Sequence, residues 1–82
     1  MTPEEVSAAI DGIKAELDRV DILVEESKVL CGAALAVAAD DPLGQMRAEH
    51  AFHVELLELL SRRVQCMARG IDLWERVAPV DG

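Results

Sequence analysis

The sequence predicts an all-α fold, an antiparallel hairpin of two long helices, and three observations lead to that prediction. Apolar residues recur at alternating steps of three and four in both halves of the chain, as they do along one face of an α-helix. Alternation of apolar and polar residues, which would indicate strands, is missing over any useful length. One clear break, Asp40-Asp41-Pro42, separates the two helical patterns.

The first helix is expected over about residues 3–39. Thr2 can cap its first turn, with Pro3 at the first helical position and Glu5 at the third, which is the pattern of a capping box. Leu23, Leu30 and Val37 are expected to widen its apolar stripe. The stripe itself consists of Val6, Ile10, Ile13, Leu17, Val20, Val24, Ser27, Cys31, Ala34 and Ala38.

The break predicts a turn at residues 40–42. A residue that precedes proline avoids the α region, so the first helix should stop by Asp40. Asp41 can then cap a second helix, expected over about residues 43–78, with Pro42 at its start and Pro79 after its end. A turn this short folds the two helices back on each other. One continuous helix kinked at Pro42 is the alternative, although a kink needs neither a stop nor a cap.

The second helix carries the longest stripe, and we expect it to be the seam around which the fold is built. Nine of its eleven positions are apolar and the other two hold the only histidines of the chain: Leu43, Met46, His50, His53, Leu57, Leu60, Val64, Met67, Ile71, Trp74 and Ala78. Its spacing is that of the a and d positions of a coiled coil. The residues expected in the core or interface are Leu17, Val20, Val24, Leu57, Leu60, Val64, Met67, Ile71 and Trp74.

The hairpin also predicts which charges meet. Residues whose numbers sum to about 82 should face each other across such a turn. Arg62, Arg69 and Arg76 recur every seven residues and would then lie opposite acidic parts of the first helix, around Asp18 and Asp21, Asp11, and Glu4 and Glu5. Alternatively, Arg62, Arg63 and Arg69 could contact an anion or a carboxylate of a partner.

His50 and His53 allow three interpretations. The expected register places them near Ser27 and Cys31, with Glu49 on the same face. A metal site would use His50, His53, Cys31 and Glu49, but a strong zinc signature supplies four ligands at characteristic spacings. A hydrogen-bonded polar layer is favoured, so no metal and no cofactor is predicted. In the third interpretation, protonation of the imidazoles near neutral pH loosens the bundle.

Cys31 and Cys66 should lie about 20 Å apart along one hairpin, which rules out an intrachain disulfide. Both are expected to be small buried hydrophobes. An intersubunit contact between them in an end-to-end antiparallel dimer is the alternative. Two thiols without a recognisable export signal predict a cytoplasmic protein.

Composition excludes several classes of function. A net charge of −8 disfavours nucleic acids and anionic membrane surfaces as partners. The longest weakly polar run, residues 29–39, is too short to span a bilayer. The chain has no Ser/His/Asp arrangement with a supporting fold and no glycine-rich phosphate loop, and its helical glycines are expected to allow close helix approach. The sequence therefore predicts a non-enzymatic protein.

Two helices cannot enclose a core by themselves, so we expect 82 residues to form a homodimer, a four-helix bundle. The pattern resembles that of small helical-hairpin regulators of the Rop type, over the whole chain but without a shared motif. The expected function is a small protein-interaction module, an adaptor, chaperone or inhibitor-type regulator, with a protein partner. The alternatives are an acidic nucleic-acid-mimic inhibitor and a metal- or small-ligand-binding bundle that uses His50 and His53.

Overall fold

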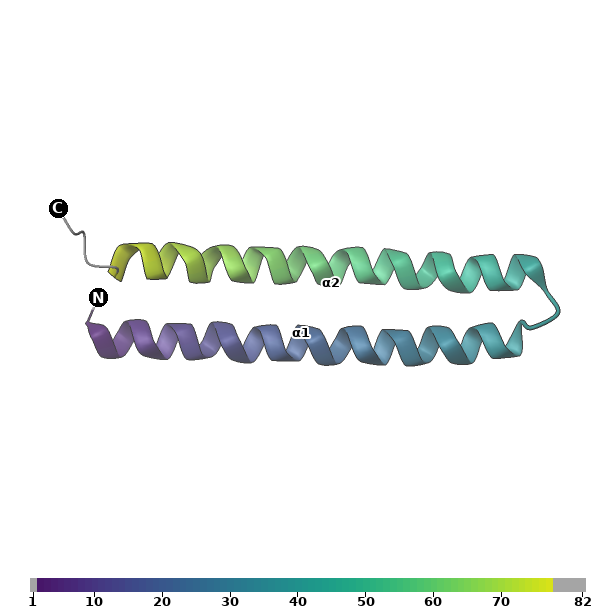
Figure 1. Ribbon diagram of the computed structural model, residues 1–82, viewed down its shortest axis with the longest axis horizontal. Helices are drawn as coiled ribbons and strands as arrows, with labels where there is room; N and C mark the ends of the chain where they lie inside the picture. The colour runs from purple at the N-terminus through teal and green to yellow at the C-terminus, as the bar shows by residue number, and fades with distance from the viewer. Residues whose placement is uncertain (1, 78–82) are drawn as a thin grey trace.

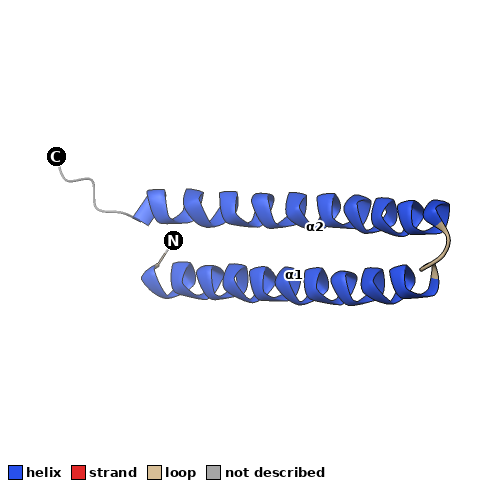
Figure 2. Ribbon diagram, turned by 45° about the vertical axis from the view of Figure 1, so that its right-hand side comes forward, coloured by secondary structure: helices blue, strands red, loops and turns tan. Residues whose placement is uncertain are grey.

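The computed structural model describes residues 2–77, and these form two long helices packed side by side (Figure 1). Helix α1 spans Pro3–Val37 and helix α2 spans Pro42–Val77, with no strand in residues 2–77. The helices run antiparallel along their whole length, and the view in Figure 2 shows the same arrangement. The predicted all-α hairpin is confirmed, and the single kinked helix is wrong.

The helix boundaries follow the predicted caps. The hydroxyl of Thr2 accepts a hydrogen bond from the backbone N–H of Glu5 at 3.2 Å, and Pro3 is the first helical residue. At the turn, the Asp41 carboxylate accepts from the N–H of Leu43 at 3.2 Å. Helix α1 ends two residues earlier than expected and α2 begins one residue earlier. The predicted end of the second helix at Ala78 and Pro79 lies outside the described residues.

Glycine avoids crowding at one position, next to this turn. A Cβ atom at Gly44 would lie 2.7 Å from the Asp41 carboxylate and 3.0 Å from the Cβ of Ala38. At Gly12 and Gly32, in contrast, an added Cβ would meet nothing within 4 Å, and at Gly70 it would make an ordinary contact with Ile13. The expectation that the glycines allow close helix approach is therefore wrong for Gly12 and Gly32.

Helix α1 packs through the predicted stripe. Val6, Ile10 and Val20 are buried, and the positions between and beyond them are half-buried as far as Cys31. Toward the turn the stripe shifts by one residue, because Leu35 is half-buried and Ala34 is exposed. Leu30 and Val37 do not widen this stripe, since both are exposed.

Helix α2 packs through a different face from the predicted one. Leu59, Cys66 and Gly70 are buried against α1, and Phe52, Leu56, Arg63 and Leu73 are half-buried. Each of these residues lies one position before a member of the predicted seam. The six seam residues from the core and interface prediction are 43–68% exposed: Leu57, Leu60, Val64, Met67, Ile71 and Trp74.

The prediction chose the wrong face because α2 carries two apolar stripes. They are offset by one residue and hence by about 100° around the helix. The predicted stripe is more apolar. The stripe that packs contains small residues, Cys66 and Gly70, which let the backbones approach, and Arg63, which makes it look polar in the sequence. Arg63 forms an ion pair with Asp21 of α1 and so remains compatible with that position.

The hairpin is elongated, with principal extents of 63 × 21 × 14 Å and a radius of gyration of 18.7 Å. A compact domain of this length would have a radius of about 12 Å. Within residues 2–77, the core consists of five buried hydrophobic side chains: Val6, Ile10, Val20, Leu59 and Cys66. Much apolar surface is therefore left outside the contact between the two helices.

Candidate interaction surface

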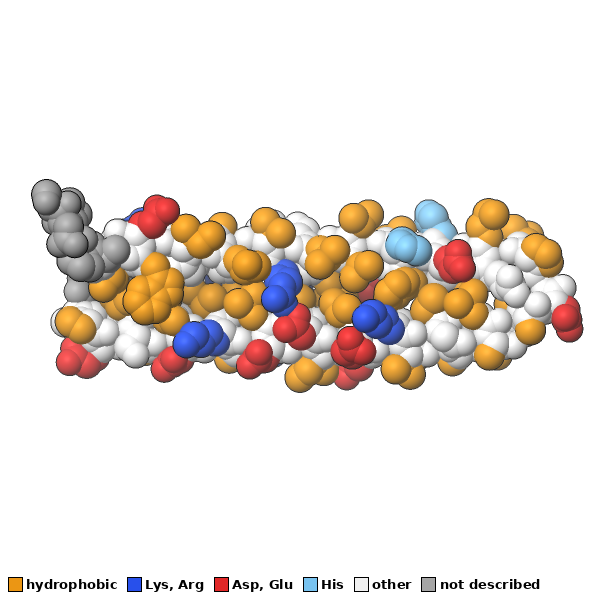
Figure 3. Space-filling view, viewed as in Figure 1, with side chains coloured by type: hydrophobic (Ala, Val, Ile, Leu, Met, Phe, Trp, Pro, Cys, Tyr) orange, Lys and Arg blue, Asp and Glu red, His pale blue; other side chains and the backbone are white. Residues whose placement is uncertain are grey.

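The outer α2 stripe is the main apolar surface of the molecule. It comprises Leu43, Met46, His50, His53, Leu57, Leu60, Val64, Met67, Ile71 and Trp74, all of them exposed. Figure 3 shows this face, with hydrophobic side chains and the histidines along α2 and charged side chains along α1. An unbroken spacing of three and four residues makes this surface a template for another α-helix.

The two histidines lie in this stripe, and neither makes the predicted contact with Ser27 or Cys31 of α1. The Nδ1 atom of His53 lies 2.7 Å from the carbonyl oxygen of Glu49, a geometry in which the ring N–H donates to the helix backbone. The His53 ring also meets the edge of Phe52, with centroids 5.5 Å apart. The imidazole of His53 is therefore held on the surface by its own helix.

Ser27 and Cys31 face a different part of α2. They line a surface hollow together with Ala48, Ala51 and Phe52. The Cys31 thiol lies 3.9 Å from the carbonyl oxygen of Ala48. The structure therefore does not bring His50, His53, Cys31 and Glu49 together, and residues 2–77 contain no group of three or more potential metal ligands. The predicted polar layer would join a histidine to Ser27 or to a carboxylate. Among residues 2–77 no such hydrogen bond is formed, and His53 bonds to the backbone of Glu49 instead.

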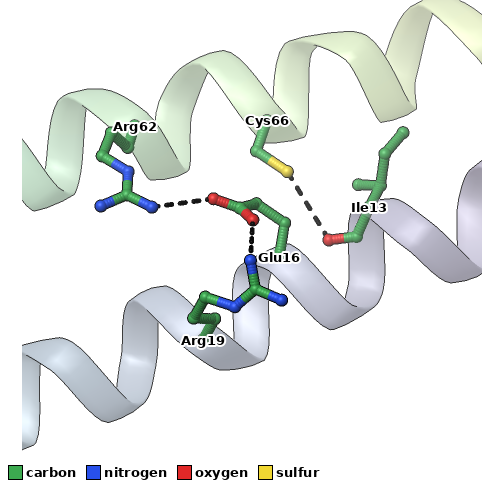
Figure 4. A network of polar contacts seen from close by, with 5 residues as sticks. All are labelled: Ile13, Glu16, Arg19, Arg62 and Cys66. Atoms are coloured by element: carbon green, nitrogen blue, oxygen red, sulfur yellow. Dashed lines mark hydrogen bonds and ion pairs between the residues drawn. The ribbon is translucent and has the colours of Figure 1, made fainter.

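A polar network closes one edge of the contact between the helices (Figure 4). Glu16 of α1 accepts a hydrogen bond from Arg62 of α2 at 2.9 Å and another from Arg19 at 3.2 Å. The Arg62 hydrogen bond holds the pKa of the Glu16 carboxyl below its ordinary value, against partial desolvation, and the charges of Arg19 and Arg69 act in the same direction as Arg62.

The predicted register is approximately confirmed, because the residues that contact each other across the two helices lie about equally far from the turn along the chain. The arginine partners differ in detail. Arg62 pairs with Glu16 and Arg63 with Asp21, whereas Arg76 pairs with Asp72 of its own helix at 3.0 Å. Arg69 lies with Glu16 and Gly12 in a hollow between the helices. Since Arg62 and Arg63 already hold carboxylates of α1, an outside anion would compete with these carboxylates for the two guanidinium groups.

Cys66 lies at the centre of the helix contact. It is fully buried, and its thiol donates to the carbonyl oxygen of Ile13 at 3.5 Å (Figure 4). Cys31 is half-buried and contacts α2 much nearer the turn. Because α1 covers Cys66, this thiol cannot reach a second subunit while the hairpin is closed.

A second apolar surface lies on the outside of α1. We define the outer α1 patch as Ile22, Val29, Leu30, Ala33, Ala36 and Val37, all exposed. The four large side chains among them are 58–90% exposed. A signal was present in the sequence, since apolar residues recur every seven positions from Ala8 through Ala15, Ile22 and Val29 to Ala36.

Charge separates the two helices. Helix α1 holds eight acidic and three basic residues, whereas α2 holds five of each. The net negative charge therefore comes from α1, from Asp40 and Asp41 of the turn and from Asp81, and α2 is neutral overall. The two apolar surfaces thus present different electrostatic surroundings to a partner.

Comparison with known proteins adds no relative: no family model matches the chain, and no curated protein or solved structure does. Within residues 2–77, neither helix is long and apolar enough to cross a bilayer.

Proposed function

We propose that this protein is a non-enzymatic interaction module that acts through helix packing, and that its outer α2 stripe pairs with a second copy to form a four-helix bundle. The observation that carries the proposal is the stripe itself, ten positions of unbroken heptad spacing exposed along one helix. An exposed stripe of this length is too large to be an ordinary scatter of surface apolar residues.

The exposed area supports association. The hairpin exposes 6220 Å². A compact monomer of 8.9 kDa exposes about 4800 Å². The excess, about 1400 Å², exceeds the roughly 800 Å² that each partner contributes to a standard interface. Pairing of two copies would therefore bring the surface of each subunit near that of a compact protein.

The stripe is complementary to itself in the antiparallel direction. Two copies arranged about a two-fold axis between Leu57 and Leu60 pair Leu43 with Trp74, Met46 with Ile71, His50 with Met67, His53 with Val64, and Leu57 with Leu60. Every histidine then lies opposite an apolar residue. The imidazoles are kept apart, and large residues meet at both ends of the interface.

Flanking charges favour the same direction. Arg47 and Glu75 lie in one row beside the stripe, near its opposite ends. Antiparallel pairing brings Arg47 of one copy toward Glu75 of the other, whereas parallel pairing leaves the two rows on opposite sides of the seam. Because α2 is neutral overall, two copies approach through it without the repulsion that α1 would impose. The charged face of α1 beside the stripe, seen in Figure 3, forms a polar rim.

The test is the solution mass by light scattering over a dilution series, for the native protein and two matched variants. We expect twice the chain mass of 8.9 kDa for the native protein. Leu57→Ser with Val64→Ser should give a monomer. Ile22→Ser with Val29→Ser makes the same kind of change, seven residues apart, on the outside of α1, and should leave the dimer intact.

The melting temperature provides a second measurement that needs no variant. A dimer gains stability with concentration, so the melting temperature of the native protein should be highest at the highest concentration and fall on dilution. A native protein that is monomeric at all concentrations, with a constant melting temperature, would overturn the proposed pairing.

A further inference from the structure

We propose that the outer α1 patch is a docking site for a basic amphipathic helix of a different protein. This inference rests on the proposed function as an interaction module, and it names the chemistry of the partner that the module would bind. It concerns a surface that the proposed pairing through α2 leaves open.

The patch is apolar and lies on the side of α1 that no helix of the chain can cover. Val29 and Leu30 are each 70% exposed and Val37 is 90% exposed. They lie beside or opposite the stripe of α1 that contacts α2, in which Val20 is fully buried. The contact with α2 therefore uses one side of α1, and the outward side remains free for another element.

The spacing of the patch fits a helix. Its members form two neighbouring rows, one of Ile22, Val29, Ala33 and Ala36 and one of Leu30 and Val37, within which the steps are three, four or seven residues. This arrangement extends over about 22 Å of α1, at about 1.5 Å per residue. An amphipathic helix of about 16 residues, with apolar anchors at matching intervals, would cover this length.

Charge selects the kind of helix. Asp21, Glu25 and Glu26 line a surface hollow together with Ile22, Val29 and Leu30. Asp21 is paired with Arg63, and Glu25 has a single exposed contact with Lys28 at 3.4 Å. Lysine or arginine residues beside the apolar anchors of a partner would meet these carboxylates.

The same charges disfavour a second copy of α1 or an anionic membrane surface as the partner of the patch. A second copy of α1 would bring eight acidic residues against eight, with only three basic residues on each side. An anionic membrane surface would be repelled for the same reason. A basic helix from another protein is therefore the occupant that the composition of α1 favours.

The experiment uses a fluorescein-labelled synthetic helix of 18 residues with leucine at the a and d positions and lysine at most others. Fluorescence anisotropy at physiological salt would measure its binding to the native protein. A peptide with glutamate in place of lysine is the first control. We expect the lysine peptide to bind and the glutamate peptide not to bind.

Two pairs of variants test the site. Ile22→Ser with Val29→Ser should weaken binding about tenfold or more, and Leu57→Ser with Val64→Ser should leave it unchanged. Glu25→Gln with Glu26→Gln should weaken binding, whereas Asp11→Asn with Glu58→Gln, which removes the same charge elsewhere, should have little effect. Circular dichroism would establish that each variant keeps its helices.

Three results would overturn the inference: absence of binding, an equal loss with both charge-matched pairs, or a loss caused by the α2 pair and not by the α1 pair. The second result would mean attraction to net charge alone, and the third would place docking on the outer α2 stripe. If the native protein is monomeric but the α1 pair still weakens binding, the proposed pairing fails and this inference stands.

Discussion

Arg63 shows how a single residue can conceal a packing face. It lies in the row of α2 that faces α1, between the buried residues Leu59 and Cys66, and pairs there with Asp21. An arginine can pack its aliphatic stem along apolar neighbours while its guanidinium reaches a carboxylate at the edge. A pattern search by hydrophobicity counts this position as polar and so shifts the predicted face by one residue.

Glu16 leads to a prediction for acid conditions. Because Arg62 holds the pKa of this carboxyl below its ordinary value of 4.5, Glu16 stabilises the fold fully above that value. This contribution is lost as the pH falls through the lowered pKa. We expect Glu16→Gln to lower the melting temperature at about pH 6 and to make a smaller difference at about pH 3.

The measurement is thermal unfolding of both proteins by circular dichroism at the two pH values. Glu58→Gln is the control, because it removes a carboxylate from an exposed position of α2 outside this network. If Glu16→Gln and the native protein differ by the same amount at both pH values, the ion pair of Glu16 does not contribute as described.

At the scale of the helix, adjacent leucines of α2 distinguish the face that packs from the face that was predicted. Leu59 is 2% exposed and Leu60 is 43% exposed. Leu59→Ala should lower the free energy of unfolding by about 2–5 kcal/mol, the usual range for a buried leucine. Leu60→Ala should cost the hairpin less, about 1 kcal/mol, and should instead weaken pairing of two copies.

Urea unfolding at several protein concentrations would separate these effects. The cost of Leu59→Ala should be the same at every concentration, and the cost of Leu60→Ala should depend on it. If Leu60→Ala lowered the free energy of unfolding more than Leu59→Ala at all concentrations, the predicted seam, and not the face observed here, would form the contact between the two helices.

At the scale of the whole molecule, Trp74 is a natural probe of association. It is the only tryptophan, it lies at one end of the outer α2 stripe, and it is 57% exposed in the single hairpin. In the proposed antiparallel pair it would be covered by Leu43 of the second copy. We expect blue-shifted fluorescence emission from the dimer and a red shift on dilution, as the indole becomes exposed to water.

The variants used for solution mass provide the controls for this measurement. Leu57→Ser with Val64→Ser should show the red-shifted emission at every concentration, and Ile22→Ser with Val29→Ser should behave as the native protein does. Emission that stays constant while the mass changes from dimer to monomer would argue against pairing through this end of the stripe.

Local chemistry made most of the hairpin predictable. The caps at Thr2 and Asp41, the prolines that follow them, and the stripe of α1 from Val6 to Cys31 depend on residues close together in the sequence. These features can therefore be recognised in the sequence without knowing which helix packs against them. The all-α fold, the turn, and the approximate register follow from them.

The choice between the two overlapping stripes of α2 was decided only in the tertiary structure. Periodicity measures how apolar one side of an isolated helix is, whereas packing also depends on how well that side fits its neighbour. Cys66 and Gly70 are small enough to lie against α1, and Arg63 finds Asp21 there. These three residues do not look like a packing face in the sequence. Because they pack against α1, the more apolar stripe is left exposed on the outside of α2.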